Sequence, residues 1–290
     1  MSTPPVVLTV AGTDSGGAAG IAADLAAIGH LGCHGACVVT AVTAQDTTGV
    51  HAMHAVPIDV VDAQVGAVLD DLPVAVVKTG MLGTPTVVAL VADRLGHLPL
   101  VVDPVLAATS GAVLGDGSVM DAYVQELLPR ALVATPNHDE ARVLTGRDDP
   151  PPDLAARLAD LGCAVVLTGG PEWRPGRRAT SCTDWVCLPG GRPEPLAHPA
   201  VATSADHGTG CTFASALAAL LAHPLAETRG HCPHPDAGSP PADLTADVLV
   251  SACLRAAAYV TIQLTTSSTW RLGRGRGPVA HTPPAQPRHT

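Results

Sequence analysis

Aromatic residues and lysine are the two kinds of residue that this 290-residue chain has least of. Phe, Trp and Tyr together make up 2% of it, whereas hydrophobic residues make up 47%. A buried core must therefore consist mainly of Ala, Val and Leu side chains. Lys78 is the only lysine, and 16 basic residues stand against 26 acidic ones, which gives a formal net charge of −10. This balance argues against a general nucleic-acid-binding protein, because such a protein needs a basic surface.

Long apolar runs are missing as well. No segment contains the ~18 uninterrupted apolar residues of a membrane-spanning helix. The first residues, MSTPPVVLTVAG, lack the basic region of a signal peptide and soon become Gly-rich. We therefore expect a cytoplasmic protein that has neither a membrane nor a nucleic acid as its partner.

Cysteine occurs eight times, which in the cytoplasm indicates free thiols rather than disulfides. Cys33, Cys37, Cys163 and Cys253 lie in apolar stretches and are expected to be small core residues. The segments CHGAC (33–37) and HCPH (231–234) contain residue types that bind metals. No second pair stands at the spacing of a zinc site, so a metal site in either segment is the less favoured interpretation.

Short Val-rich runs alternate with Ala- and Leu-rich helical patterns along most of the chain. Nearly continuous apolar runs, typical of parallel strands covered on both faces, lie at 6–11, 37–43, 74–78, 100–103, 132–135 and 165–168. Helical patterns lie near 18–31, 57–71, 84–96, 118–129, 137–146 and 153–162. This order predicts a doubly wound α/β sheet. A TIM barrel uses the same alternation, but residues 179–188 predict a hairpin that interrupts its eight regular units.

The last third of the chain predicts two further helices and little else. Residues 208–222 form a helix opened by a glycine turn, and residues 244–264 form a long closing helix. Between them, residues 223–242 are rich in Pro, His and Gly and are expected to be a surface loop. The segment after residue 270 is low in apolar residues, so we expect one domain over residues 1–270 and a disordered tail over 271–290.

Polar residues and glycines gather directly after the predicted strands. In an open parallel sheet, ligands bind beyond the carboxyl ends of the strands, so these residues should form one surface. They are Gly12-Thr13-Asp14, Ala44-Gln45-Asp46, Lys78-Thr79-Gly80-Met81, Asp103-Pro104, Pro136-Asn137 with Glu140, and Gly169-Gly170. Each group alone is consistent with turn chemistry. Six strands in a row that end in this way favour a binding site.

The segment GTGC (208–211) opens a helical stretch rich in Ala and Leu. Its glycines allow backbone N–H groups to converge on an anion, which the helix dipole also favours. The segment is not a Walker A loop, because the GK[ST] ending is absent. Cys211 falls in the first helical turn, where a thiolate is stabilised and can act as a base at neutral pH. The alternative is a small residue packed beneath the turn.

Two carboxylates lie on the same expected surface, opposite the glycine turn. Asp103 ends a strand, and Glu140 lies one helical turn after Asn137. Carboxylates beside an anion-binding turn fit Mg²⁺-dependent phosphoryl transfer from a nucleotide. The alternative for Glu140 is a charge that complements the helix dipole. A dinucleotide site is excluded, because AGTDSGGAAGIAAD (11–24) lacks the GxGxxG spacing.

Six motifs in this order resemble the hydroxymethylpyrimidine/phosphomethylpyrimidine kinases of thiamine biosynthesis. They are AGTDSGGAAGIAAD (11–24), TAVTAQDTTGV (40–50), KTGML (78–82), DPVLAATSG (103–111), TPNHDEA (135–141) and DHGTGCTFASALAA (206–219). The resemblance covers residues 7 to 269 and implies a ribokinase-like three-layer sandwich with a mostly parallel central sheet. It also implies ATP- and Mg²⁺-dependent phosphorylation of 4-amino-5-hydroxymethyl-2-methylpyrimidine, its monophosphate, or both, by a homodimer.

The resemblance further implies a role for each matched residue. The aminopyrimidine ring would be held by Gly12, Asp24, Gln45 and Met81. The transferred phosphoryl group would meet an anion hole formed by Gly208, Thr209 and Gly210, and Cys211 would take the proton of the hydroxymethyl group, tuned by His207. Mg²⁺ would be arranged by Asp103 and Glu140, and the nucleotide by Asn137, Thr168 and Gly170. Asp206 is an alternative acid or base.

Four positions depart from the family pattern. Two lysines near the phosphates, in the AKSG and KGG segments of the family, are Thr109 and Thr168 here. The Asn after the motif glutamine is Asp46, and a Gln of the first motif is Ala22. Two other functions therefore stay open. One is a kinase for another ring alcohol, such as pyridoxal or a secondary metabolite, and the other is a non-catalytic ligand-binding homologue.

Overall fold

The computed structural model describes residues 3–106, 115–170, 179–229 and 245–281. The strands in this part are β1 (Val6–Ala11), β2 (His34–Val39), β3 (Ala41–Asp46), β4 (Gly49–Ala55), β5 (Val74–Thr79), β6 (Leu100–Val102), β7 (Val133–Ala134), β8 (Ala164–Leu167), β9 (Ser181–Cys187) and β10 (Glu194–Pro199). The α-helices are α1 (Gly20–His30), α2 (Ile58–Leu69), α3 (Pro85–Leu95), α4 (Gly117–Ala122), α5 (His138–Thr145), α6 (Pro151–Ala159), α7 (Thr209–Arg229) and α8 (Ala246–Ser267). Two short turns, the π-helical η1 (Tyr123–Leu127) and the 3-10 η2 (Leu128–Arg130), follow α4.

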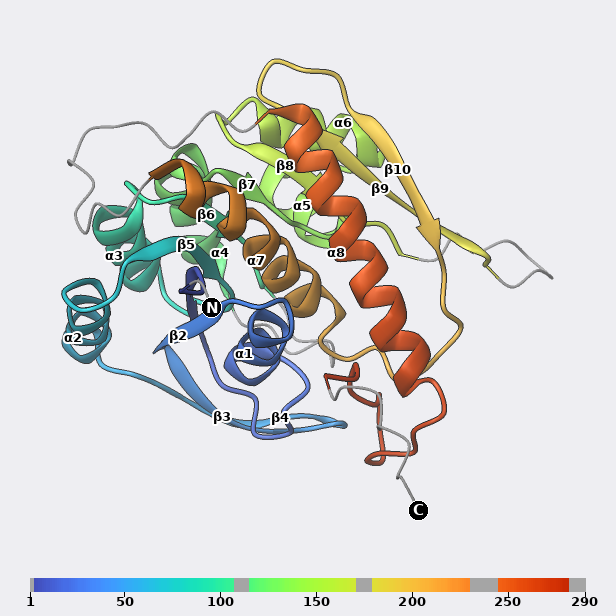
Figure 1. The fold of residues 1–290 in the computed structure, drawn as a ribbon, viewed down its shortest axis with the longest axis horizontal. Coiled ribbons are helices and arrows are strands. Elements are labelled where there is room, and N and C mark those ends of the chain that lie inside the picture. Colours follow the sequence, from blue (N-terminus) through green and yellow to red (C-terminus); the bar gives the residue numbers. More distant parts are fainter. Residues whose placement is uncertain (1–2, 107–114, 171–178, 230–244, 282–290) are drawn as a thin grey trace.

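An eight-stranded sheet runs through the molecule in the order β10-β9-β8-β7-β6-β5-β1-β2 (Figure 1). Its strands are parallel from β2 to β8, whereas β9 and β10 each pair antiparallel with the preceding strand. Every residue of β1, β5, β6, β7 and β8 is buried. Continuous burial explains why these strands are Val-rich runs with no polar alternation. The prediction of a mostly parallel α/β sheet is confirmed.

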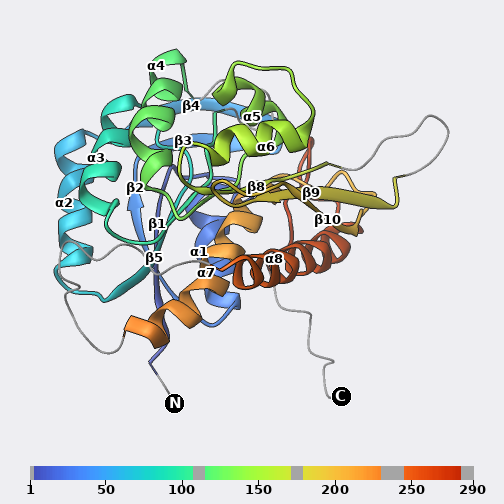
Figure 2. The ribbon, with the colours of Figure 1, turned by 90° about the horizontal axis from the view of Figure 1, so that it is seen from above.

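Helices cover both faces of the sheet, so the molecule has three layers (Figure 2). Successive side chains of a strand point to opposite faces of the sheet. Leu8, Val77 and Val102 pack on the face that α2 to α6 cover. Val7 and Val76 belong instead to the cluster that contains the side chains of α7 and α8. Both clusters are mainly aliphatic, as the shortage of aromatic residues predicts.

Helices α7 and α8 are long and apolar enough to cross a membrane by length and composition alone. The apolar window of α7 is 67% buried and that of α8 is 44% buried. Most apolar side chains of α7 belong to the core cluster between the sheet and α8, so core packing accounts for its composition. The helix also extends past the predicted end at residue 222, through Pro224, to residue 229. Residues 230–242 of the predicted loop lie outside the described residues.

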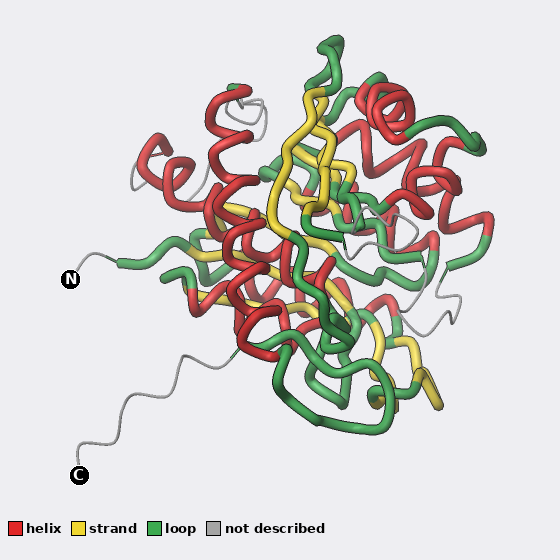
Figure 3. Tube along the Cα trace, turned by 90° about the vertical axis from the view of Figure 1, so that its right-hand side faces the viewer, coloured by secondary structure: helices red, strands yellow, loops and turns green. Residues whose placement is uncertain are grey.

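The prediction of one strand over residues 37–43 is wrong. Strand β2 ends at Val39, and Thr40 turns the chain away from the sheet: its N–H donates to Ala11 O, and its hydroxyl donates to Met81 O at 2.7 Å. The next strand, β3, pairs only with β4, in a hairpin apart from the main sheet (Figures 1 and 3). This hairpin carries Gln45. The predicted hairpin at 179–188 is likewise a single strand, β9, which pairs with β10.

The prediction of a disordered tail is wrong for residues 271–281. Val279 and Ala280 are 2% and 0% exposed. Backbone hydrogen bonds join this part of the chain to His207, whose N–H donates to Gly277 O at 3.0 Å and whose carbonyl accepts from Val279 N at 3.1 Å. Packing against the domain, rather than its own apolar content, orders this segment. Residues 282–290 lie outside the described residues.

Candidate active site

A cavity of about 230 Å³ lies at the carboxyl edge of the parallel sheet. Pockets for drug-sized ligands have roughly 300–1,000 Å³, so this cavity suits a single-ring compound. The predicted site residues that line it are Gly12, Gln45, Met81, Asp103, Asn137, Glu140, Thr168, Gly208, Thr209, Gly210 and Cys211. Asp24 and Gly170 do not line it. Strand ends far apart in sequence thus meet at one cavity, as the strand-end pattern predicts.

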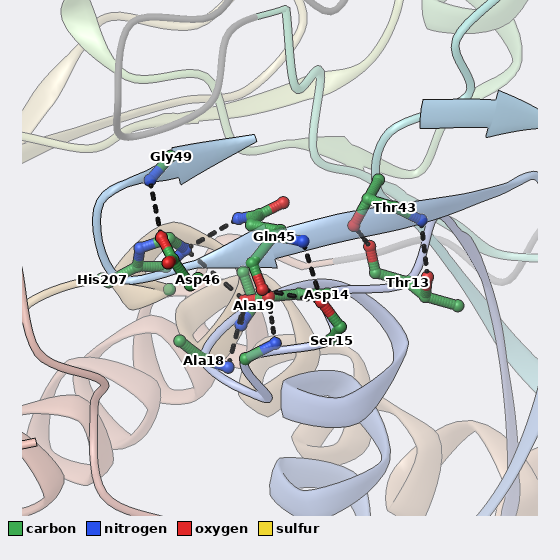
Figure 4. A network of polar contacts seen from close by, with 12 residues as sticks. Thr13, Asp14, Ser15, Ala18, Ala19, Thr43, Gln45, Asp46, Gly49 and His207 are labelled. Carbon is green, nitrogen blue, oxygen red and sulfur yellow. Dashed lines mark hydrogen bonds and ion pairs between the residues drawn. The ribbon is translucent and has the colours of Figure 1, made fainter. Parts of the chain in front are cut away.

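The loop after β1 is fixed by Asp14, which the sequence singled out only as part of a strand-end group. Its carboxylate accepts hydrogen bonds from the N–H groups of Gly16, Ala18 and Ala19 at 2.8, 3.1 and 2.9 Å (Figure 4). Satisfying these N–H groups stabilises the turn that leads into α1. The cavity wall formed by this loop is therefore rigid on its inner side.

The β3–β4 hairpin is held against the same loop by paired side-chain contacts (Figure 4). Thr43 donates two hydrogen bonds to Thr13: its N–H to Thr13 Oγ1 at 3.0 Å and its hydroxyl to Thr13 O at 2.7 Å. The hydroxyl of Ser15 donates to Gln45 O at 2.7 Å and accepts from Gln45 N at 2.8 Å. These contacts fix the backbone of Gln45 at the cavity.

The Gln45 side chain reaches His207, which is 3% exposed. The two Nε2 atoms are 3.1 Å apart, and His207 Nε2 lies 3.6 Å from Asp14 Oδ2 (Figure 4). Burial lowers the pKa of His207, so its neutral ring accepts the hydrogen bond from the Gln45 amide. His207 therefore positions Gln45. Within the described residues His207 forms no hydrogen bond or ion pair with Cys211, so tuning of the thiol by His207 remains a prediction.

The turn before α7 requires glycine at position 208. Gly208 has φ of +87°, and a Cβ there would collide with the carbonyl oxygen of Ala18. Thr212 closes the turn from inside, since its hydroxyl donates to Gly208 O at 2.8 Å. Gly210 has open space where a Cβ would lie. Residues Gly208 to Cys211 line the cavity, so the N-terminus of α7 lies beside it, as an anion-binding helix N-terminus requires.

Asp24 is not a cavity residue, which corrects its expected role in ring binding. It is 0% exposed and accepts hydrogen bonds from Lys78 Nζ at 2.8 and 3.0 Å. The hydroxyls of Thr9 and Ser215 also donate to it, at 2.6 and 2.7 Å. Its carboxylate is thus fully engaged beneath the site. A buried lysine needs such a partner, because an unpaired charge in the interior is very unfavourable.

Cys211 lies close to this buried pair, and the structure corrects its expected thiolate character. Burial raises the pKa of Cys211 to about 12, although Lys78 opposes the rise. At neutral pH the free protein therefore holds a protonated thiol. Asp103 is a neighbour of both groups: its Oδ2 lies 3.8 Å from Lys78 Nζ, and Cys211 forms a hydrogen bond to the Asp103 carboxyl.

Asp103 and Glu140 are the two acidic groups that face the cavity from the sheet side. Burial raises the pKa of Asp103 to about 6, against the effect of Lys78. Burial and the charge of Asp103 raise the pKa of Glu140 to about 8. Glu140 also completes a capping box with Asn137, at 2.9 Å in both directions. Glu140 thus caps the helix through hydrogen bonds, and it also lines the cavity.

Thr168 lies at the far end of the cavity. Its backbone forms a bridge with Asn137, and its N–H donates to Pro136 O at 2.8 Å. Gly170 is exposed beside it. Thr109, where the family has another lysine, lies outside the described residues. Asp206, expected as an alternative acid or base, instead pairs with Arg276 through two hydrogen bonds, of 2.7 and 2.6 Å.

Comparisons with known proteins agree on one family. The sequence model of the phosphomethylpyrimidine kinase family matches residues 14–228. The hydroxymethylpyrimidine/phosphomethylpyrimidine kinase of Rhizobium meliloti is 39% identical over 287 residues, which cover 95% of this chain and 96% of the relative. The protein of the same name from Streptomyces coelicolor is 45% identical over 226 residues, or 76% and 82% of the two chains.

Comparison with a solved structure identifies the fold. The ADP complex of a pyridoxal kinase from Bacillus subtilis superimposes with a TM-score of 0.79 and 27% identity, over 96% of this chain and 98% of that chain. The resemblance drawn from the six motifs and the ribokinase-like sandwich are both confirmed. The matched proteins are kinases, so the chain is a phosphotransferase. It belongs to the phosphomethylpyrimidine kinase family.

Proposed function

We propose that the protein transfers the terminal phosphoryl group of ATP to 4-amino-5-hydroxymethyl-2-methylpyrimidine, to its monophosphate, or to both. One observation carries this proposal. A ring-sized cavity has Gln45 and Met81 on one wall and the turn from Gly208 to Cys211 on another. A hydroxymethyl group on a ring held by the first wall would point toward the anion-binding turn. The relatives from Rhizobium meliloti and Streptomyces coelicolor are named as hydroxymethylpyrimidine/phosphomethylpyrimidine kinases, which supports the same substrate class.

The ring would be held by Gln45, Gly12 and Met81. Because the Gln45 amide N–H₂ donates to His207, its carbonyl oxygen is left to accept a hydrogen bond from a ring amino group. A Cβ at position 12 would meet the methyl group of Met81. Glycine there leaves the flexible thioether free to pack against an aromatic face. These groups recognise a flat ring that carries an amine.

The transferred phosphoryl group would meet the N–H groups of Gly208, Thr209 and Gly210. Phosphoryl transfer proceeds through a loose transition state, so in-line positioning and charge neutralisation matter more than a strong base. The Cys211 thiol would first release its own proton to water in the cavity. The substrate hydroxyl would then form the new bond to phosphorus as the bond to ADP breaks, and its proton would pass to the Cys211 thiolate. Lys78 is the buried cation that favours the thiolate form required to accept it.

The donor set also fits Mg²⁺. Asp103 Oδ2 is buried without a hydrogen-bond partner, and the charge of Asp103 raises the pKa of Glu140. Mg²⁺ is commonly bound by one or two carboxylates together with substrate phosphates. Asp103 and Glu140 would hold the ion, with Asn137, Thr168 and Gly170 beside the nucleotide. The ion would neutralise charge on the phosphates of ATP.

A second substrate is favoured by one specific finding. The superimposed structure from Bacillus subtilis is named a pyridoxal kinase. Pyridoxal is likewise a flat, nitrogen-containing ring that carries a hydroxymethyl group. Phosphorylation of pyridoxal by this protein is therefore the second candidate activity.

We further propose that the enzyme works in the cytoplasm as a homodimer, on a small molecule rather than on nucleic acid or a membrane. The named relatives are metabolic kinases, and the net charge of −10 supports the absence of a nucleic-acid partner. Sedimentation of the purified protein measures the oligomeric state. A single species with the mass of one chain would contradict the dimer.

The function is tested by mass spectrometry of reaction products. The purified protein is incubated with Mg²⁺ and ATP and with the hydroxymethylpyrimidine, its monophosphate or pyridoxal. We expect a monophosphate from the first substrate, and a diphosphate if both steps occur. Cys211→Ala in parallel should lose the product but keep ring binding, measured by calorimetry. A wild-type protein that phosphorylates none of the three compounds contradicts the proposal.

A further inference from the structure

The C-terminal segment, residues 272–281, contacts the tip of the β3–β4 hairpin. The N–H groups of Arg274 and Gly275 both donate to Thr47 Oγ1 at 3.1 Å. The approach is so close that a Cβ at Gly275 would collide with the carbonyl oxygen of Thr47, and one at Gly273 with its side chain. This hairpin carries Gln45 two residues earlier. One end of the segment is thus fixed at the ring-binding wall of the cavity.

The other end of the segment lies against the residues that precede α7. The N–H of His207 donates to Gly277 O, and its carbonyl oxygen accepts from Val279 N. Between the two ends, Arg276 forms a bidentate pair with Asp206, with Nε–Oδ1 and Nη2–Oδ2 distances of 2.7 and 2.6 Å. The segment therefore joins the ring-binding wall to the anion-binding turn.

The two arginine pairs of this segment are not equivalent. Arg274 reaches Asp46 at 3.2 Å, but its side chain is 81% exposed. An exposed single-contact ion pair contributes little, because water and salt screen it. Arg276 is 55% exposed and Asp206 28% exposed, and their two parallel hydrogen bonds fix orientation as well as distance. Arg276 is thus the side chain able to set the position of its partner.

Asp206 also contacts the anion-binding turn, Gly208 to Cys211, through its backbone carbonyl. Its carbonyl accepts from the hydroxyl of Thr209 at 2.6 Å and from Thr209 N at 3.3 Å. His207, the next residue, holds the Gln45 amide. A shift of Asp206 would therefore move both Thr209 and His207.

We propose that Arg276 is a positioning residue for phosphoryl transfer. Arg276 acts through Asp206 to hold the turn from Gly208 to Cys211 at a fixed position relative to Gln45. The C-terminal segment supplies to the active site a guanidinium that never touches the substrate. Its backbone contact with Thr47 anchors the segment at the opposite wall. The kinetic part of this inference rests on the proposed function, whereas its structural part does not.

The test compares Arg276→Gln, Arg276→Lys and the charge exchange Arg276→Asp with Asp206→Arg. Arg276→Gln should lower kcat about tenfold, since small misplacements of reacting groups can cost up to ~10²-fold, and should change KM for the ring alcohol less than about twofold. Arg276→Lys should recover part of kcat, because one of the two hydrogen bonds remains. The charge exchange should recover more than either single variant.

Arg271→Gln is the matched control. Arg271 lies just before the same segment and is exposed, and within the described part of the chain its side chain forms no ion pair or hydrogen bond. The control removes an identical charge and should leave kcat and KM unchanged. Gly275→Val adds a second probe, since it displaces the segment from Thr47 without changing any charge. It should raise KM for the ring alcohol more than it lowers kcat.

Hydrogen exchange of the ligand-free protein provides a readout that needs no kinase activity. Arg276→Gln should raise exchange in residues 206–212 several-fold relative to Arg271→Gln, and Gly275→Val should do so in residues 43–49. Wild-type exchange in residues 206–212 of Arg276→Gln would overturn the inference, whether or not product forms. A wild-type protein without product but with these exchange changes would contradict the proposed function alone.

Discussion

Lys78 and Asp24 form a salt bridge of 2.8 Å in which neither side chain has any exposed surface. Burial by itself would lower the pKa of Lys78, but the charges of Asp24, Cys211 and Asp103 together more than reverse that effect. Thr9 and Ser215 use the remaining acceptor positions of the carboxylate. The only lysine of the chain is thus a fixed positive charge beneath Cys211, not a surface residue.

Lys78→Met should lower the free energy of unfolding by about 3–5 kcal/mol, because it leaves a buried carboxylate without its cation. Urea denaturation followed by circular dichroism measures the loss. Arg94→Met is the control, since Arg94 and Asp62 form an ion pair in which both side chains are 42% exposed, and such pairs contribute about 0–1 kcal/mol. Equal losses in the two variants would contradict the buried pair.

Alkylation of Cys211 by iodoacetamide should be very slow in the free protein. Its pKa of about 12 leaves, at pH 7.5, a thiolate fraction about 10³-fold below that of free cysteine. Lys78→Met should slow the reaction further, because it removes the cation that favours the thiolate. The rate is measured by mass spectrometry of the peptide that contains residue 211. Reaction as fast as that of free cysteine would mean that the thiolate is already formed.

Glu140→Gln should stabilise the protein at high pH. Because the folded pKa of about 8 exceeds the ordinary value of about 4.3, the stabilising effect of the protonated group is complete below pH ~4 and is lost as pH rises through 8. The variant should therefore match the wild type near pH 4 and exceed it at pH 9 by up to about 5 kcal/mol, the upper bound that the two pKa values set. Gln can still occupy the capping box.

The effect of Mg²⁺ on thermal stability should also depend on Glu140. A divalent cation between Asp103 and Glu140 would relieve their repulsion, so MgCl₂ should raise the melting temperature of the wild type more at pH 9 than at pH 6. The rise should be smaller in Glu140→Gln. A melting temperature that responds to Mg²⁺ equally in both proteins would place the ion elsewhere.

Thr168→Lys should raise kcat/KM for ATP. Loss of one preorganised donor costs on the order of 10²–10³-fold in rate, and the family carries a lysine at this position. The Thr168 side chain lines the cavity, so a longer cationic side chain there can reach a phosphate. Thr265→Lys adds the same charge on an exposed part of α8 and serves as the control. An unchanged rate in Thr168→Lys would show that the lost lysine is not limiting.

The buried strands and the strand-end residues were predictable because they depend on local pattern and one topological rule. Val-rich runs identify β1, β5 and β8, and parallel order then places Asp103, Asn137 and Thr168 at the same edge. The hairpin was missed because residues 37–43 are rich in β-branched and apolar residues, and only the contacts of Thr40 with Ala11 and Met81 end the strand. No local signal reports such a long-range contact.

The same reason explains the errors at the site. Asp24 belongs to a motif, and its partner Lys78 lies 54 residues away, so spacing alone could not separate a ligand contact from a buried salt bridge. Asp206 pairs with Arg276, 70 residues further on. The C-terminal segment was predicted to be disordered because it has few apolar residues. Its glycines in fact permit the close approach to Thr47, which composition cannot distinguish from flexibility.

Complete burial of Lys78 has a practical consequence for chemical labelling. Apart from the amine at the chain terminus, the protein has one amine, and it is protonated and enclosed in the folded state. An acylating reagent can modify residue 78 only while the core is open, so the extent of its acylation, read by mass spectrometry, measures the population of opened molecules.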